Sequence, residues 1–247
     1  MSDLLTAIRF LTILPLGRGE ALEPKKMAAS MAWFPFVGLL LGAALMALDL
    51  GLTGRVFPRP VVDAILIAFM ALVTGGLHLD GFADTLDGTF GGRGDKARTL
   101  EIMKDSRIGA MGVVGIAVLL LLKFTALGGV PADDRWHALV LMPVLARWSQ
   151  VSMAFRAKAA RSGGSLAGSF VEYLGFGHLL LASLATLAAA FFIGGTTGVA
   201  ALAAVSLLTL ASKAHFNRWL GGITGDTIGC VSEINEVLVL LVFTVII

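Results

Sequence analysis

The sequence predicts an all-α protein, a polytopic bundle of about seven transmembrane helices with an amino-terminal interfacial helix, folded as one domain over residues 1–247. Hydrophobic residues make up 57% of the chain and charged residues only 15%, a balance too apolar for an ordinary soluble domain. The apolar residues also gather in long runs separated by short polar stretches, as in chains that cross a bilayer several times. Both observations favour an integral membrane protein.

Seven apolar runs are candidates for the spans. They are Met27–Leu50, Val61–Leu79, Ile108–Leu127, His137–Phe155, His178–Ile193, Val199–Ser212 and Thr227–Ile247. The fifth and sixth are short for a bilayer, so either their true ends lie further out or they are tilted partners joined by a turn at Gly194–Gly198. In the first run, Gly38 and Gly42 form a GxxxG pair, which chance or packing within the chain explains most simply.

The first sixteen residues predict an amphipathic helix. One side carries Ser2, Asp3, Thr6, Arg9 and Thr12, and the other is mostly leucine and isoleucine. This pattern fits an interfacial helix lying on the membrane. A helix packed against the cytoplasmic end of the bundle fits it equally well.

Lysine and arginine predict the orientation of the spans. When alternate loops are assigned to opposite sides, one side receives only Arg55, Arg59 and Arg135. The other side receives Arg9, Arg18, Lys25, Lys26, Arg93, Lys96, Arg98, Lys104, Arg107, Arg156, Lys158, Arg161, Lys213 and Arg218. The positive-inside rule then places the amino terminus inside and the carboxyl terminus outside. We therefore expect a multi-pass protein of the cytoplasmic (inner) membrane whose polar segments face the cytoplasm.

The most informative stretch is 75–92, Gly-Gly-Leu-His-Leu-Asp-Gly-Phe-Ala-Asp-Thr-Leu-Asp-Gly-Thr-Phe-Gly-Gly. On a helix, Asp80, Asp84 and Asp87 would fall within an arc of about 60°. Three carboxylates this close repel one another, so a cation is needed to keep them all ionised. Mg²⁺ is the natural candidate because it prefers oxygen ligands and bridges carboxylates to substrate phosphates. The alternative is a solvated helix face at a membrane surface.

A second polar segment, 101–112, precedes the third predicted span. Lys104 and Arg107 are three residues apart and could neutralise phosphate oxygens from one helix face. Basic residues are also expected beside any cytoplasmic span, and Asp105 could simply pair with a neighbour.

The third polar segment, 224–236, leads directly into the last apolar run. Asp226, Glu233 and Glu236 would lie within an arc of about 80° of one helix. Acids near the end of a span normally need a partner, which favours a functional role. The competing interpretation is a structural pair with Arg147 or Arg218.

Four further residues lie within or beside apolar runs. Arg147 is in the middle of a span and must have a partner, either a substrate phosphate or an acid of the cluster. Lys123 lies near the outer end of its span, where snorkelling to the surface is the simpler expectation. His78 could be a base or a substrate contact, although packing is more usual, and Cys230, the only cysteine, is most simply a small packed residue.

Two acidic clusters with flanking cations at one membrane face suit the transfer of a phosphoryl-linked group from a pyrophosphate. In such a reaction, metal and positioned cations neutralise the charge on the phosphates. The net charge of +2 gives no indication of nucleic-acid binding.

Three motifs carry a resemblance to a known family. They are Gly-Gly-Leu-His-Leu-Asp-Gly-Phe-Ala-Asp-Thr-Leu-Asp-Gly, Lys-Asp-Ser-Arg-Ile-Gly-Ala-Met-Gly and Thr-Gly-Asp-Thr-Ile-Gly-Cys-Val-Ser-Glu. The chain resembles the cobalamin synthase family, the adenosylcobinamide-GDP ribazoletransferases, over almost its whole length. Cys230 and Phe82 depart from the residues expected there, Ala and Leu, and neither is a candidate ligand.

The resemblance implies a single catalytic domain that performs the last step of the B12 nucleotide loop: α-ribazole or its 5'-phosphate displaces GMP from adenosylcobinamide-GDP, with Mg²⁺ required. Carried onto this chain, the metal ligands are Asp80, Asp84 and Asp87. The candidate catalytic residues are these three with Glu233 and Glu236, and the candidate substrate-binding residues are His78, Lys104, Arg107, Arg147 and Asp226. The expected partners are both substrates and the lipid bilayer, and a homo-oligomer is compatible with the sequence.

Two other functions are weighed against this one. A CDP-alcohol phosphotransferase would also bind metal through aspartates in a helical membrane bundle, but its Asp-x-x-Asp-Gly-x-x-Ala-Arg signature is absent. A cation or proton transporter would hold its acids near the midplane. We expect the first and third polar segments to form one site.

Overall fold

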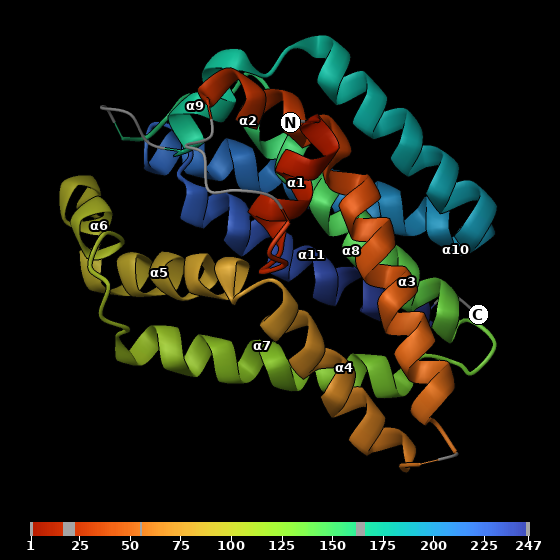
Figure 1. Ribbon diagram of the computed structural model, residues 1–247. Coiled ribbons are helices and arrows are strands. Elements are labelled where there is room, and N and C mark those ends of the chain that lie inside the picture. The colour runs from red at the N-terminus through yellow and green to blue at the C-terminus, as the bar shows by residue number, and fades with distance from the viewer. Residues whose placement is uncertain (1, 17–22, 55, 162–165, 246–247) are drawn as a thin grey trace.

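The computed structural model describes residues 2–16, 23–54, 56–161 and 166–245, and within these ranges every named element is a helix (Figure 1). The helices are α1 (Asp3–Leu11), α2 (Pro24–Ser30), η1 (Met31–Trp33), α3 (Phe34–Leu52), α4 (Arg59–Val73), α5 (Leu77–Gly92), α6 (Lys96–Ile102), α7 (Ala110–Gly129), α8 (Arg135–Ala154), α9 (Leu166–Tyr173), α10 (Phe176–Trp219) and α11 (Gly225–Val245). Arg18, Arg55 and Ile247, which enter the predictions of orientation and span, lie outside the described residues.

Several of these helices could cross a membrane. By length and hydropathy, four helices of the described chain qualify, Pro24–Leu52, Ala110–Gly129, Phe176–Trp219 and Gly225–Val245, and α4 with α5 makes up to five. The central helix α8 is not among them, because its polar residues lower its hydropathy. It is buried along most of its length against α3, α10 and α11, so it faces protein rather than lipid. The fold is an all-helical, multi-pass membrane bundle, as predicted.

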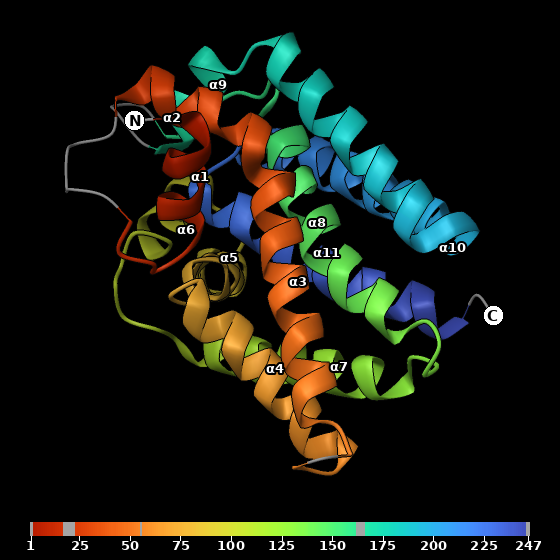
Figure 2. The same ribbon diagram turned by 45° about the vertical axis from the view of Figure 1, so that its right-hand side comes forward.

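The predicted span Val61–Leu79 is wrong in one respect, because the helix breaks inside it. α4 ends at Val73, α5 begins at Leu77, and the two axes differ by 87°. Gly75 and Gly76 make the turn with φ of 61° and 69°, a conformation that glycine adopts without steric cost. Figure 2 looks almost along α5 while α4 runs across the view. The helix that carries the aspartates is therefore separate from the apolar helix before it.

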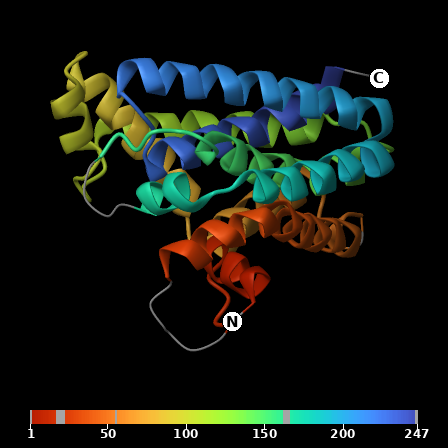
Figure 3. The ribbon, with the colours of Figure 1, turned by 90° about the horizontal axis from the view of Figure 1, so that it is seen from above.

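The turn predicted at Gly194–Gly198 is confirmed. α10 doubles back at Gly195, whose φ and ψ of 55° and −138° are not helical, and its two arms run in opposite directions (Figure 3). A Cβ at Gly198 would lie only 2.2 Å from the carbonyl oxygen of Ala190. The two short predicted spans are thus the arms of one helical hairpin.

Packing within the chain explains the GxxxG pair on α3. A Cβ at Gly38 would lie 2.5 Å from the carbonyl oxygen of Pro143, and one at Gly42 would lie 2.7 Å from Cα of Val140. Both neighbours are backbone atoms of α8, so the two glycines let α3 and α8 touch directly.

The amino-terminal helix α1 packs on the bundle through contacts with α2 and α3, as one of the two alternatives predicted. Thr6, Ala7 and Leu11 are buried. Thr6 was expected on the polar side, but its hydroxyl donates to the Ser2 carbonyl oxygen at 3.3 Å. That bond lets a threonine face the protein interior.

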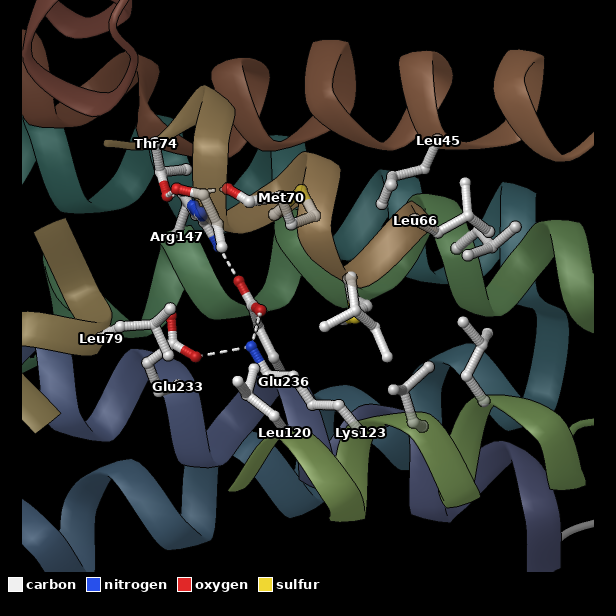
Figure 4. Close-up of a pocket in the computed structure, with 16 residues that line it drawn as sticks. Leu45, Leu66, Met70, Thr74, Leu79, Leu120, Lys123, Arg147, Glu233 and Glu236 are labelled. Atoms are coloured by element: carbon white, nitrogen blue, oxygen red, sulfur yellow. Dashed lines mark hydrogen bonds and ion pairs between the residues drawn. The ribbon is translucent and has the colours of Figure 1, made fainter. Parts of the chain in front are cut away.

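Four charged side chains meet inside the bundle and form what we call the buried quartet: Lys123, Arg147, Glu233 and Glu236 (Figure 4). The ammonium group of Lys123 lies 2.5 Å from carboxylate oxygens of both glutamates, and Arg147 donates to Glu236. None of the four is more than 6% exposed. The prediction that Lys123 snorkels is therefore wrong, because α7 turns this side chain toward α11. Two cations and two anions balance, as buried charges require.

A second ionic network lies near the C-terminal end of α7. Arg135 of α8 pairs with Asp49 of α3 at 2.8 Å and with Asp63 of α4, and it donates to the Leu127 carbonyl oxygen at 3.2 Å. It joins four helices, so Arg135 has a structural use beyond setting topology.

The buried quartet predicts a large loss of stability for Lys123→Met. The change leaves Glu233 buried without a cation, which should cost roughly 3–5 kcal/mol. The thermal unfolding midpoint in detergent measures the effect, and Lys104→Met is the control because Lys104 is exposed. The double variant Lys123→Met with Glu233→Gln should recover part of the loss. Equal midpoints for Lys123→Met and the control would contradict the pairing.

The contact between α3 and α8 predicts that Gly38→Ala destabilises the protein by about 1–3 kcal/mol, because the new methyl group meets backbone atoms. Gly51→Ala in the same helix is the matched control, since a Cβ there meets nothing within 4 Å. The control should be neutral or gain up to about 1 kcal/mol from helix propensity. Unfolding midpoints of the purified variants decide between the two, and a Gly38→Ala protein as stable as the control would exclude the close contact.

Candidate functional site

The candidate site begins where α5 crosses α11. A Cβ at Gly81 would lie 2.9 Å from Cα of Asp226, and one at Gly229 would lie 3.2 Å from Cα of His78. Helix backbones come this close only where a glycine removes the side chain between them. The crossing therefore brings the first and third polar segments of the sequence together at Asp226.

Four aspartates gather around this crossing. Asp80, Asp84 and Asp87 all lie on α5, as predicted, and Asp226 lies in the first turn of α11. Asp80 is exposed and the other three are half-buried. Asp84 lies within electrostatic range of all three other carboxylates. In the part of the chain that the structure describes, no three His, Cys, Asp or Glu side chains are already arranged to hold a metal ion.

Asp87 has a contact that the sequence did not reveal. Its two carboxylate oxygens accept hydrogen bonds from the backbone amides of Gly109 at 2.7 Å and Gly112 at 2.8 Å, at the start of α7. A Cβ at either glycine would lie 2.5 Å from one of these oxygens. The two glycines of the second motif therefore make room for Asp87, which satisfies free amides at a helix N-terminus. Metal binding by Asp87 stays a prediction.

Asp226 is held from two directions. Arg161, on the segment after α8, forms an ion pair with it at 3.0 Å. The start of α11 is fixed by Thr224 and Thr227, because the backbone amide of each donates to the hydroxyl of the other, at 2.9 and 3.1 Å. The sequence analysis counted Arg161 only for topology. Its position in a polar cytoplasmic loop was the one available signal.

Two cavities adjoin these carboxylates on either side of Asp80. The larger, about 620 Å³, is lined by Asp80 and Asp84 together with apolar residues of α1, α5 and α7. The smaller, about 120 Å³, is lined by Asp80, Asp226 and His78. Asp80 lines both. A group bound in one cavity would thus lie next to a group bound in the other.

His78 is buried, as is Gln150 of α8, and their side-chain nitrogens lie 3.0 Å apart. The Gln150 amide also donates to the Ser232 hydroxyl at 2.8 Å. The sequence analysis missed Gln150, although a glutamine within an apolar span is itself a signal of a buried polar contact.

Lys104 and Arg107 lie on the segment between α6 and α7, and both are exposed. Arg107 does pair with its neighbour Asp105, at 2.6 Å, and the bonded guanidinium lowers the pKa of that carboxyl to about 2. Neither cation lines the two cavities, whereas Ser106 from the same segment lines the larger one. A phosphate contact from Lys104 or Arg107 stays a prediction.

Glu233 and Glu236 do not converge with Asp226 in the way the helix arc suggested. They lie further along α11, where Lys123 and Arg147 engage their carboxylates, and neither lines the two cavities. Arg147 is 1% exposed and pairs with an acid, one of its two predicted alternatives. These ion pairs favour a structural role for the three residues, and a catalytic role for Glu233 and Glu236 stays a prediction. Cys230 is buried among Phe82, Leu119 and Val237, as expected for a packed residue.

The comparisons with known proteins agree with the motifs. A family model described as cobalamin-5-phosphate synthase matches residues 3–244. The adenosylcobinamide-GDP ribazoletransferase of Geotalea daltonii is 45% identical over 235 residues, which cover 95% of this chain and 94% of that protein. Proteins of the same name from Roseiflexus and Caldanaerobacter subterraneus are 42% identical over 96% of this chain (87% of theirs) and 34% identical over 99% (98% of theirs).

No solved structure matches the chain significantly. The family match covers nearly all of the sequence, including the three motifs and both helices of the crossing. The chain therefore belongs to the cobalamin-5-phosphate synthase family.

Proposed function

We propose that this enzyme transfers α-ribazole, or its 5'-phosphate, onto adenosylcobinamide-GDP with release of GMP, which gives adenosylcobalamin or its 5'-phosphate. The observation that supports this reaction most is Asp80, which lines two unequal cavities beside Asp84 and Asp226. Two substrates must meet at one phosphorus atom, and two cavities that share a carboxylate provide such a place.

The aspartates fit a requirement for Mg²⁺. Carboxylate oxygens are the donors this ion prefers, and it often takes only one or two of them, with water and substrate phosphates completing its shell. Asp80 and Asp84, which line the larger cavity, are the residues that would hold it, with Asp226 and Asp87 next to them. When bound, Mg²⁺ would neutralise charge on the pyrophosphate and on the leaving GMP.

The residues of the site suggest how the transfer proceeds. A ribazole hydroxyl oxygen forms a bond to the phosphorus that stays with the corrinoid, and the bond from that phosphorus to the bridging oxygen of GMP breaks. The hydroxyl proton passes to a carboxylate between the two cavities, either Asp80 or Asp226. The ion pair with Arg161 holds Asp226 in place for this purpose.

A transporter is less well supported by the same geometry. The buried acids Glu233 and Glu236 are already matched by Lys123 and Arg147. The aspartates instead lie beside cavities, next to helix ends and a glycine turn. This arrangement suits a reaction site better than an ion pathway through the membrane.

We also propose that the site faces the cytoplasm of a cell whose inner membrane holds the chain. The lysine and arginine distribution supports this orientation. Both substrates are polar and adenosylcobinamide-GDP carries a diphosphate, so a cytoplasmic site gives them direct access. A homo-oligomer stays a prediction.

The carboxylate cluster predicts that Asp80→Asn and Asp84→Asn each lower Mg²⁺-dependent turnover by at least about a hundredfold, because each keeps the side-chain size and removes a charge that binds metal. GMP release from adenosylcobinamide-GDP in the presence of α-ribazole is the measurement, with Mg²⁺ titrated for each variant. Asp133→Asn is the matched control, since Asp133 is exposed at the other end of α7. Near-normal turnover in both site variants, with a folded protein, would remove this cluster from the mechanism.

The orientation is tested with reporters. A reporter inserted near Gly94 should lie in the cytoplasm, and one fused after Ile247 should lie outside, because in the proposed topology α7, α8, both arms of α10 and α11 together cross the membrane an odd number of times. Paired phosphatase and fluorescent-protein fusions distinguish the two sides. Both reporters on the same side would show that the number of spans is wrong.

A further inference from the structure

The smaller cavity has an aromatic wall. Phe10, Phe34 and Phe170 come from α1, α3 and α9, and each ring packs on the other two with centroids 5.6 to 6.4 Å apart. All three line the cavity. Three glycines of α5 and α11 line it as well, and at one of them, Gly225, a Cβ would meet nothing within 4 Å. The volume of the cavity is about 120 Å³, which is close to that of a cavity of about 150 Å³ that binds one benzene molecule.

The same cavity has polar groups. The Gln150 amide can donate to Nε2 of His78, which places the proton of the neutral imidazole on Nδ1. That Nδ1 is buried and has no hydrogen-bond partner among the described residues. A buried donor without a partner is costly unless something accepts its bond. His78, which lines the cavity, therefore holds one donor that the described chain does not use.

The carboxylates Asp80 and Asp226 also line this cavity. A ligand with a flat aromatic part and a hydroxylated part could thus contact phenylalanine rings and carboxylates together. Nucleosides have this combination, and aromatic rings stack favourably on flat bases.

We propose that this cavity is the subsite for the heteroaromatic base of the acceptor nucleoside, with Phe10, Phe34 and Phe170 against the base, His78 donating to an unprotonated ring nitrogen, and the sugar hydroxyls toward Asp80 and Asp226. This inference rests on the proposed function. It assigns the smaller substrate to the smaller cavity and leaves the larger, about 620 Å³, for the corrinoid diphosphate.

The shared carboxylate makes the assignment chemically consistent. The acceptor hydroxyl must reach the phosphorus of the other substrate, and Asp80 lines both cavities. A base held by the phenylalanine wall leaves its sugar on the side of the aspartates. His78 then acts as a positioning and specificity residue, because it touches the base and not the reacting atoms.

The cleanest test fills the cavity without disturbing the protein. Gly225 lines the cavity and is exposed, and a Cβ there meets nothing within 4 Å, so Gly225→Leu adds bulk beside the cavity without a clash with the protein. Its expected effect is a rise of about tenfold or more in KM for α-ribazole, with KM for adenosylcobinamide-GDP unchanged. Gly177→Leu is the matched control, since Gly177 also lies in the first turn of a long helix with open space around it.

A second measurement tests the proposed hydrogen bond from His78 to the base, by comparing two acceptors on the same protein. Wild-type enzyme should use an analogue of α-ribazole whose acceptor ring nitrogen is replaced by C–H about tenfold less well, the effect of one lost hydrogen bond. His78→Phe should abolish this discrimination, whatever its overall activity. The ratio is taken between two acceptors on one protein, so a partial loss of folding does not change it.

The outcomes separate this inference from the proposed function. A wild-type protein that transfers no ribazole with Mg²⁺ contradicts the proposed function. A wild-type protein that transfers ribazole, with KM for ribazole unchanged in Gly225→Leu, contradicts the base subsite alone. Equal discrimination between the two acceptors in wild type and His78→Phe would overturn the role of His78.

Discussion

The candidate site depends on the contact between α5 and α11. Gly81 and Gly229 have no side chains, and each lies directly against the backbone of the opposite helix. A larger residue at either position would force the helices apart, because backbone atoms cannot yield as a flexible side chain can. Only this contact brings Asp226 beside Asp80 and Asp84, which are more than a hundred residues away in sequence. The glycines of the motifs therefore matter to the chemistry as much as the acids do.

The acids of α11 serve two purposes at two depths. Asp226 lies in the first turn, beside the cavities, while Glu233 and Glu236 lie deeper and bind Lys123 of α7 and Arg147 of α8. Inside an apolar bundle these ion pairs leave little freedom for α11 to slide or rotate, since any displacement would separate buried charges. The quartet thus fixes the position of α11, and with it the position of Asp226 in the first turn of that helix.

Much of the fold followed from hydropathy, and part of the site followed from spacing. The apolar runs identified the helices, and the interval of the aspartates correctly placed them on α5. The break at Gly75 and Gly76 was missed, because Leu77 and Leu79 extend the apolar run beyond the two glycines. Lys123 was misassigned and Arg161 and Gln150 were overlooked, because the partners of a polar residue in a helix depend on which helices pack together. One sequence shows the periodicity of each helix but not its neighbours.

The bend before α5 gives the site its surroundings. Since α5 leaves α4 at 87°, it packs against α7 and α11, and its aspartates lie between the glycine turn and the start of α7. In the proposed transfer, attack by water would compete with attack by the ribazole hydroxyl, so the acceptor must be bound where water is largely excluded. Phe34 and Phe170, which line the smaller cavity, are buried, while Asp80 is exposed and lines both cavities. The fold thus places an aromatic-lined cavity and a larger cavity beside the same carboxylate, which is the arrangement that the proposed reaction between two substrates needs.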